Sequence, residues 1–141
     1  MATLHPFLRF NDKKCREAME FYKGIFGGKV EYMTLGESPM AKDAPDKSDY
    51  IIHSELSSGK ITFFGSDMMR DKAVVGDNVG MALNCESEQE LNEHFSKLSQ
   101  GGDVFMKPEK QFWGGMFAMV TDKYGVEWML NFQMEPPKKS K

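Results

Sequence analysis

Cysteine is scarce in this sequence, since only Cys15 and Cys85 occur among its 141 residues. Two cysteines provide neither a disulfide framework nor a cysteine-based metal motif. Each falls inside a segment that we predict to be a regular element, among apolar neighbours. We therefore interpret both as reduced core thiols of a cytoplasmic protein.

Long apolar runs and one-signed charge are missing as well. No run approaches the ~20 residues of a membrane-spanning helix, and the N-terminus lacks the basic segment and apolar stretch of a signal peptide. The formal net charge is −3 with both signs mixed along the chain. The one basic cluster, at residues 138–141, follows two prolines and indicates a solvated tail. We therefore expect a cytoplasmic protein that binds neither membranes nor nucleic acid.

What the sequence does contain is one pattern of elements that occurs twice. The first copy, about residues 4–66, begins with a strand at 4–10 and a helix from about Lys13 to Phe26. Asn11 or Asp12 can cap the start of this helix, and Gly27-Gly28 ends it. The helix has an apolar stripe at helical spacing, formed by Cys15, Ala18, Tyr22, Ile25 and Phe26. Hydrophobic stretches near 29–35 and 49–56 and a strand at 60–66 complete the first copy.

The second copy, about residues 79–132, repeats this order. A strand at 79–85 leads to a capping box, Ser87 to Glu90, which opens a helix whose buried stripe is Leu91, Phe95 and Leu98. Gly101-Gly102 ends that helix. Short strands near 103–106 and 115–121 and a last strand at 126–132 follow. Phe95 and Gly101 come the same 74 residues after Phe21 and Gly27, so the two copies share their register.

Strand alternation assigns two faces to the predicted strands. In the first strand, Leu4, Leu8 and Phe10 suit packing on a helix, and His5, Phe7 and Arg9 take the other face. In the last strand, Trp128 and Leu130 suit the helix side, and Glu127, Met129 and Asn131 lie opposite. Such a mixed second face is typical of a curved sheet that encloses a ligand cavity, although a solvated outer face gives the same pattern.

Five segments carry a resemblance to a known family. They are Pro6-Phe7-Leu8-x-Phe10, Phe21-Tyr22-x-x-Ile25-Phe26-Gly27, Ile52-His53-Ser54-Glu55-Leu56, Phe112-Trp113-Gly114 and the block from Phe117 to Asn131. Together they resemble the PhnB-like proteins, often labelled 3-demethylubiquinone methyltransferase-like, of the vicinal-oxygen-chelate (glyoxalase/bleomycin-resistance) superfamily. The resemblance implies a single α+β domain, residues 1–141, in which duplicated βαβββ modules form a curved mixed sheet around a cavity. It also implies a homodimer, and residues 133–141 form a tail.

The methyltransferase label conflicts with the glycine pattern. A dinucleotide-type cofactor site in an α/β fold needs a glycine-rich turn that follows a strand and opens a helix. Here Gly27-Gly28 and Gly101-Gly102 follow predicted helices and precede strands. We therefore do not expect methyl transfer.

The resemblance also implies where a metal would bind. Metal-dependent members of the superfamily hold their ligands on strands one, four, five and eight, which in this sequence gives His5, Phe63, Gly80 and Met129. Only His5 can coordinate a metal, whereas catalytic zinc and non-haem iron take about three protein ligands. We therefore predict no metal and no other cofactor. A relocated site of His5 and His53 with Glu55 or Glu127 remains an alternative.

Without a metal, the expected pocket is Phe7, Arg9, His53, Phe63, Trp113, Met129 and Asn131. The candidate catalytic groups are His53, His5 and Glu127, because a histidine and a carboxylate can abstract a proton next to a carbonyl. Arg9 can bind a carboxylate or phosphate through two hydrogen bonds. Alternatively, Arg9 pairs with Glu127.

Three classes of function follow, in order of preference. The first is a metal-free protein that binds a small organic molecule. The second is an enzyme of the lyase or isomerase type that uses a relocated metal or a histidine base. The third is a dimer without a ligand. Fold kinship does not decide among them.

Overall fold

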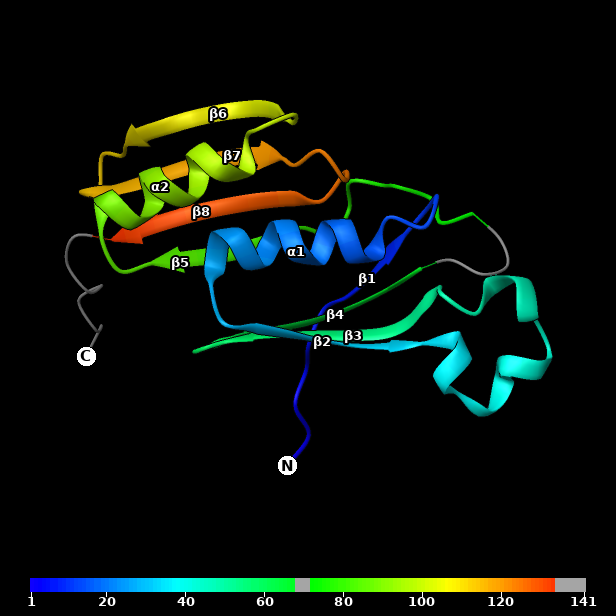
Figure 1. Cartoon of the computed structure of the whole chain (residues 1–141). Helices are drawn as coiled ribbons and strands as arrows, with labels where there is room; N and C mark the ends of the chain where they lie inside the picture. The colour runs from blue at the N-terminus through cyan, green and yellow to red at the C-terminus, as the bar shows by residue number, and fades with distance from the viewer. Residues whose placement is uncertain (68–71, 134–141) are drawn as a thin grey trace. The chain divides into compact units, whose positions relative to one another are not determined.

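The computed structural model of the chain describes residues 1–67 and 72–133. The chain divides into two compact units, Met1–Val74 and Val75–Lys141. Within the described residues each unit holds one α-helix and one four-stranded sheet (Figure 1). Each predicted βαβββ module therefore falls within one unit. Apart from residue 133, the predicted tail lies outside the described residues.

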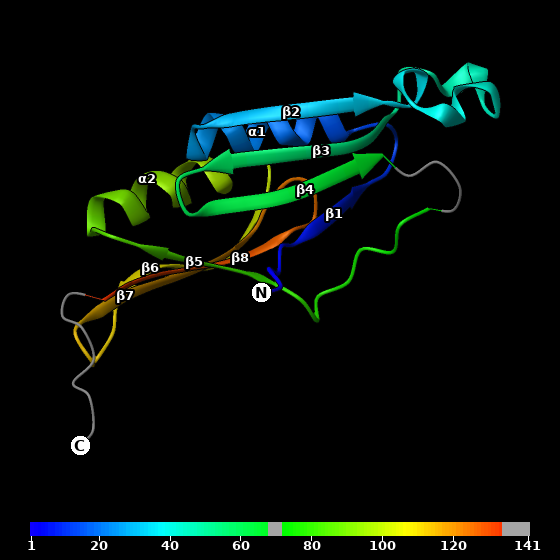
Figure 2. The same cartoon turned by 90° about the horizontal axis from the view of Figure 1, so that it is seen from below.

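The first unit contains the elements β1 (Phe7–Phe10), α1 (Cys15–Phe26), β2 (Lys29–Thr34), β3 (Ile51–Ser58) and β4 (Ile61–Asp67). Three short 3-10 helices stand between β2 and β3: η1 (Leu35–Glu37), η2 (Pro39–Lys42) and η3 (Pro45–Lys47). The strand order is β1-β4-β3-β2, with β1 parallel to β4 and the other pairs antiparallel. The helix α1 lies along one face of this sheet (Figure 2).

The second unit repeats this arrangement. Its elements are β5 (Met81–Cys85), α2 (Glu88–Leu98), β6 (Asp103–Lys110), β7 (Gly115–Thr121) and β8 (Glu127–Gln133). The strand order is β5-β8-β7-β6, and the outer pair β5 and β8 is again the parallel one. The prediction of two duplicated βαβββ modules in an α+β fold is confirmed.

The core of the first unit lies between α1 and its sheet. The buried residues of the helix are Cys15, Ala18, Met19, Tyr22 and Ile25. On the sheet side Leu56 and Phe63 are buried, and the ring of Tyr22 meets that of Phe63 edge to face at 5.4 Å. Burial of such aromatic and aliphatic side chains supplies the main stabilisation of the unit.

The start of α1 differs from the prediction. Neither Asn11 nor Asp12 caps the helix, because its N-terminal flanking residue is Lys14, whose side chain makes no cap. Instead the buried carboxylate of Asp67, at the end of β4, accepts a hydrogen bond of 2.9 Å from the backbone N–H of Cys15. Its second oxygen accepts one of 2.8 Å from the N–H of Ile51. One side chain thus holds the helix start and the start of β3.

The side chain of Asn11 binds a more distant backbone segment. Its amide nitrogen donates to the carbonyl of Ala73 at 3.0 Å, and its oxygen accepts from the N–H of Ala73 at 2.8 Å. This paired contact fixes the backbone at Ala73 against the turn between β1 and α1. Asn11 is therefore used for long-range contact instead of helix capping.

In the second unit the helix start is local, as predicted. The hydroxyl of Ser87 accepts a hydrogen bond of 3.0 Å from the N–H of Glu90. Leu91 and Leu98 are fully buried, while Phe95 is only partly buried. The turn before β8 is held by Asp122, whose carboxylate accepts hydrogen bonds from the backbone N–H groups of Tyr124 and Val126 and, at 2.8 Å, from the indole of Trp128. These contacts hold the loop against the core.

Two predicted strands are shorter than expected at their starts. Leu4 is 96% exposed and Val79 is 77% exposed, and β1 and β5 begin only at Phe7 and Met81. The strand β6 is longer than predicted, and two register shifts interrupt its pairing with β7.

Candidate functional site

Each sheet has one face packed on its own helix and a second face turned away from it. We call the second face the outer face. In the first unit the pairing register and the alternation of side chains place residues of three adjacent strands on this outer face. They are Phe7 and Arg9 from β1, Phe64 and Ser66 from β4, and His53 and Glu55 from β3. In contrast to the helix side, this face carries rings and charges together.

Four aromatic rings gather on this outer face. Phe64 is the centre, with the ring of His5 at 5.5 Å in an edge-to-face contact and the ring of His53 at 5.3 Å. The ring of Phe7 lies 6.5 Å from both Phe64 and His53. Phe7 is 44% exposed and His53 is also exposed, so faces of the cluster remain accessible.

The position of His5 in this cluster follows from the backbone. Phe7 pairs with Phe64 in the parallel register, and the N–H of Phe64 donates to the carbonyl of Pro6 at 2.9 Å. That bond holds the segment before β1 alongside β4. His5 therefore reaches Phe64 although it lies outside the strand.

A row of polar side chains crosses the same face next to the row of Phe7 and Phe64, two residues further along the strands. Arg9 pairs with Ser66 on β4, and the register that joins Ser54 to Gly65 brings His53 to the level of Ser66 from the other side. The guanidinium carbon of Arg9 lies 5.6 Å from the ring centre of Phe7. Among the described residues, none of Arg9, Ser66 and His53 makes a side-chain hydrogen bond or ion pair. Their donors are therefore available to a ligand.

Of the predicted site residues in the first unit, His5, Phe7, Arg9 and His53 lie together, but Phe63 does not. Phe63 is 2% exposed and packs against Tyr22 on the helix side. Its neighbour Phe64 takes the outer-face position. The assignment of Phe63 to the outer face was wrong by one residue.

Different hairpin loops explain this shift of register. Phe63 and Met129 each lie four residues after a hairpin glycine, Gly59 and Gly125 respectively. In the structure, the pair Ser58–Ile61 closes a loop of two residues, whereas Thr121–Glu127 closes a loop of five. The closing pairs then point to opposite sides of their sheets, so counting from the glycines assigns the wrong face in the first unit.

In the second unit, Glu127, Met129 and Asn131 lie on the face turned away from α2, as alternation predicted. Pairing places Met129 opposite Met119, and Met119 opposite Met106, so three methionines form one row across β8, β7 and β6. In the next row Asn131 lies between Phe117 and Asn84. The amide of Asn131 donates weakly to that of Asn84, at 3.5 Å.

Sequence reasoning missed several members of these outer faces: Phe64, Ser66, Met106, Phe117 and Met119. Alternation along β7 could have found Phe117 and Met119. Met106 depends on the register shifts of β6, for which the sequence gives no local signal.

Trp113 lies in the loop between β6 and β7. Its ring is 47% exposed and meets the ring of Phe112 edge to face at 5.2 Å. The loop is a tight turn, in which the N–H of Gly114 donates to the carbonyl of Gln111 and Gly114 has a φ of 92°. A side chain at Gly115 would meet the indole nitrogen of Trp113 at 2.5 Å. Gly115 thus makes room for the ring, and the place of Trp113 in the pocket remains a prediction.

The donor set for a metal is poor. In the part of the chain that the structure describes, His, Cys, Asp and Glu nowhere gather in threes close enough to hold a metal ion. With the corrected register, Phe64 takes the ligand position of β4, and like Gly80 and Met129 it is not a strong ligand for zinc or iron. The metal-free site remains our prediction.

The two thiols are poor nucleophiles. Burial raises the pKa of Cys15 to about 11, and Ser54 near its sulfur opposes this only in part. Burial likewise raises the pKa of Cys85 to about 12, with a smaller contribution from Glu90. Both groups stay protonated near neutral pH, which fits core thiols.

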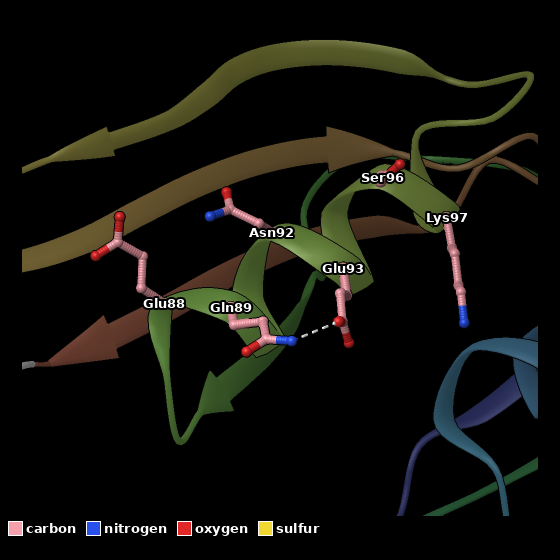
Figure 3. Close-up of a pocket in the computed structure, with 6 residues that line it drawn as sticks. All are labelled: Glu88, Gln89, Asn92, Glu93, Ser96 and Lys97. Atoms are coloured by element: carbon pink, nitrogen blue, oxygen red, sulfur yellow. Dashed lines mark hydrogen bonds between the residues drawn. The ribbon is translucent and has the colours of Figure 1, made fainter.

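A hollow of about 640 Å³ lies along the outward side of α2 (Figure 3). The residues that line it all belong to this helix: Glu88, Gln89, Asn92, Glu93, Ser96 and Lys97. Gln89 donates to Glu93 across one helical turn at 3.1 Å. Side chains of a single helix surface, with charges of both signs, do not converge on a reacting group. We do not assign a site to this hollow.

Comparison with known proteins identifies the family. The family described as 3-demethylubiquinone-9 3-methyltransferase matches residues 2–131. The chain belongs to this family. Protein YjdN of Escherichia coli (strain K12) is 29% identical and covers 95% of this chain and 97% of its own length.

Solved structures of related proteins agree. Protein PA1353 from Pseudomonas aeruginosa is 31% identical, with a TM-score of 0.78 over 93% of this chain and 98% of that chain. The structure described as a putative 3-demethylubiquinone-9 3-methyltransferase, PhnB protein, from Bacillus cereus is 27% identical, with a TM-score of 0.73 over 93% and 99%. The predicted PhnB-like resemblance is confirmed.

More distant structures share the fold alone. A glyoxalase/bleomycin resistance protein/dioxygenase family enzyme from Burkholderia phytofirmans PsJN has a TM-score of 0.59 at 12% identity, over 91% of this chain and 97% of that chain. The predicted glyoxalase/bleomycin-resistance fold is confirmed. Separately, the described part of the chain contains no helix with the length and apolar character needed to span a bilayer.

Proposed function

We propose that this protein binds a small organic molecule on the outer faces of its sheets and needs no metal to do so. The observation that carries the proposal is the cluster of His5, Phe7, His53 and Phe64, which leaves aromatic surface accessible on a sheet face. Apolar surface combined with a few convergent polar groups is typical of ligand sites. The methionine row of the second unit is a separate face that can adapt to different shapes.

The methyl transfer named in the family description is not part of the proposal. Gly27-Gly28 follows α1 and precedes β2, and Gly101-Gly102 follows α2 and precedes β6. Neither pair is therefore at the strand-to-helix turn that cradles a nucleotide-like cofactor in α/β folds.

Replacing the central ring of the cluster tests the proposal. A fragment library is screened by thermal shift, and the dissociation constants of the hits are measured by calorimetry for the wild type and for Phe64→Ala. We expect Phe64→Ala to weaken binding at least about tenfold, since loss of a packed ring costs 1.4 kcal/mol or more, roughly the value of one aromatic contact. Phe105→Ala is the matched control, because Phe105 is a 79% exposed ring on the edge strand of the other unit. Hits that bind both variants and the wild type equally would contradict the proposal.

Proton transfer is a second candidate function. His53 is exposed and its imidazole makes no hydrogen bond to a described residue, so a nitrogen is available as a general base. The test is exchange of the C3 protons of phenylpyruvate with deuterated water, followed by proton NMR. Faster exchange with wild type than with His53→Gln would support an enzyme. Equal exchange rates for the wild type, the variant and buffer would contradict proton transfer, and binding would then be the only function proposed.

The homodimer and the cytoplasmic location also stay proposals. Sedimentation velocity over a range of concentrations tests the first, with a single species of twice the 16.1 kDa chain mass as the expected result.

A further inference from the structure

We infer that the ligand of the first outer face is a planar organic anion, whose charged group binds between Arg9, Ser66 and His53 and whose ring lies on Phe7 and Phe64. This inference rests on the proposed function, because it names the chemical class of the molecule bound there. Its basis is the adjacency of the polar row and the aromatic cluster, which share one face and lie one pleat apart.

The polar row favours an anion. Arg9 is a permanent cation that makes no ion pair with a described residue, and its guanidinium lies near the ring of Phe7. A guanidinium matches a carboxylate or a phosphate with two parallel hydrogen bonds. Ser66, opposite Arg9, is 8% exposed and adds a hydroxyl donor at the base of the row. His53 adds a ring nitrogen from the third strand.

The negative side chains of this face lie in the neighbouring row, that of Phe7 and Phe64. Glu55 on β3 pairs with Phe64 on β4, and the carboxylate of Glu55 accepts a hydrogen bond of 3.5 Å from the hydroxyl of Ser57. Glu31 on the edge strand β2 is paired with Lys29 at 3.3 Å. Both carboxylates therefore lie outside the row of Arg9. Their row is about 7 Å away from it along the strands, which is the repeat of two residues. An anion bound at Arg9 is therefore kept away from both carboxylates. The ligand ring that extends toward Phe64 carries no charge, so the carboxylates do not repel it.

The aromatic cluster favours a flat molecule. Phe7 and Phe64 are tilted by 56° to each other, and Phe7 and His53 by 37°. Such an arrangement gives a ligand ring one face to stack on and one edge to meet. A saturated ring of similar size loses that complementarity.

Three related compounds separate the two features: 2-naphthoate is a planar anion, 2-naphthamide is planar and neutral, and cyclohexanecarboxylate is an anion without a flat ring. Calorimetric titrations are made with the wild type, Arg9→Gln, Arg9→Lys, Lys29→Gln and Phe64→Ala. Lys29→Gln removes one positive charge from the same face and is the matched control for net charge. Circular dichroism verifies that each variant is folded.

We expect 2-naphthoate to bind more tightly than either analogue. Arg9→Gln should weaken naphthoate about tenfold or more while leaving naphthamide unchanged, because it removes a charge-assisted pair. Arg9→Lys should restore only part of the affinity, and Lys29→Gln should behave as the wild type.

Two results would overturn the inference. If naphthamide binds as tightly as naphthoate and both are lost in Phe64→Ala, the face binds a neutral molecule, so the proposed function stands and the anion inference fails. If Arg9→Gln and Lys29→Gln reduce naphthoate binding equally, only net charge is being measured. The proposed function itself is judged separately, by the Phe64→Ala result with the unbiased library.

Discussion

The two units of this chain share one topology but differ in the chemistry of their outer faces. In the first unit that face carries Arg9, two histidines and two phenylalanines, whereas in the second it carries methionines, Phe117 and a pair of asparagines. Their helix sides are similar, since both bury leucine and aromatic side chains under one helix. The comparison teaches that packing constrains the inner residues of each copy, while the outer faces are free to diverge in their chemistry.

The sharpest way to test this division is to compare two neighbours on β4. Phe63 is buried against α1 and Phe64 belongs to the outer face. Phe63→Ala should lower the free energy of unfolding by about 3–5 kcal/mol, because it leaves a cavity in the core. Phe64→Ala should lower it by only about 1 kcal/mol, because that ring supports no helix. Urea denaturation measures both, and equal losses would contradict the assigned register.

A second comparison concerns the two helix starts, which the units hold in different ways. Asp67→Ala removes a buried carboxylate that accepts two backbone hydrogen bonds at the starts of α1 and β3. We expect a loss of about 3 kcal/mol in unfolding free energy, since two buried donors lose their partner. Ser87→Ala removes a local, exposed cap of α2 and should cost about 1 kcal/mol. A larger loss for Ser87→Ala in urea denaturation would refute this reading of the two starts.

The smallest expected effect concerns His94 on α2. Burial lowers the pKa of His94 below its usual 6.5, with Glu90 opposing the shift. The unfolded chain therefore binds the proton more readily, so the stability contributed by the neutral imidazole is present above pH 6.5 and is lost as the pH falls through the lower, folded pKa. Urea midpoints measured from neutral to acidic pH should fall less in His94→Gln than in the wild type. Parallel pH profiles would argue against a lowered pKa.

Much of the fold could be predicted because its signals are local. The stripe of α1 and the glycines that end both helices depend on neighbouring residues, and so does the Ser87 cap. Asp67 could not be recognised as the partner of Cys15, because 52 residues separate them and no local pattern joins them. The face of Phe63 was missed for a related reason, since it depends on the length of the hairpin loop after Ser58.

The candidate site was predictable only in part. Alternation along β1 and β8 correctly grouped Phe7 with Arg9 and Met129 with Asn131. The clustering of His5 and His53 around Phe64 depends on pairing between β1, β3 and β4, which the sequence pattern alone does not fix.

The most direct test of the central claim, that the outer face of the first unit binds the ligand, is a methionine-methyl NMR titration. Met33 is 46% exposed and pairs with His53 on that face, while Met19 lies on the buried side of α1 and is fully buried. Titration of 2-naphthoate into protein labelled with carbon-13 at the methionine methyl groups should shift the signal of Met33 and leave that of Met19 in place. A shift of Met19 with an unchanged Met33 would contradict binding at the outer face.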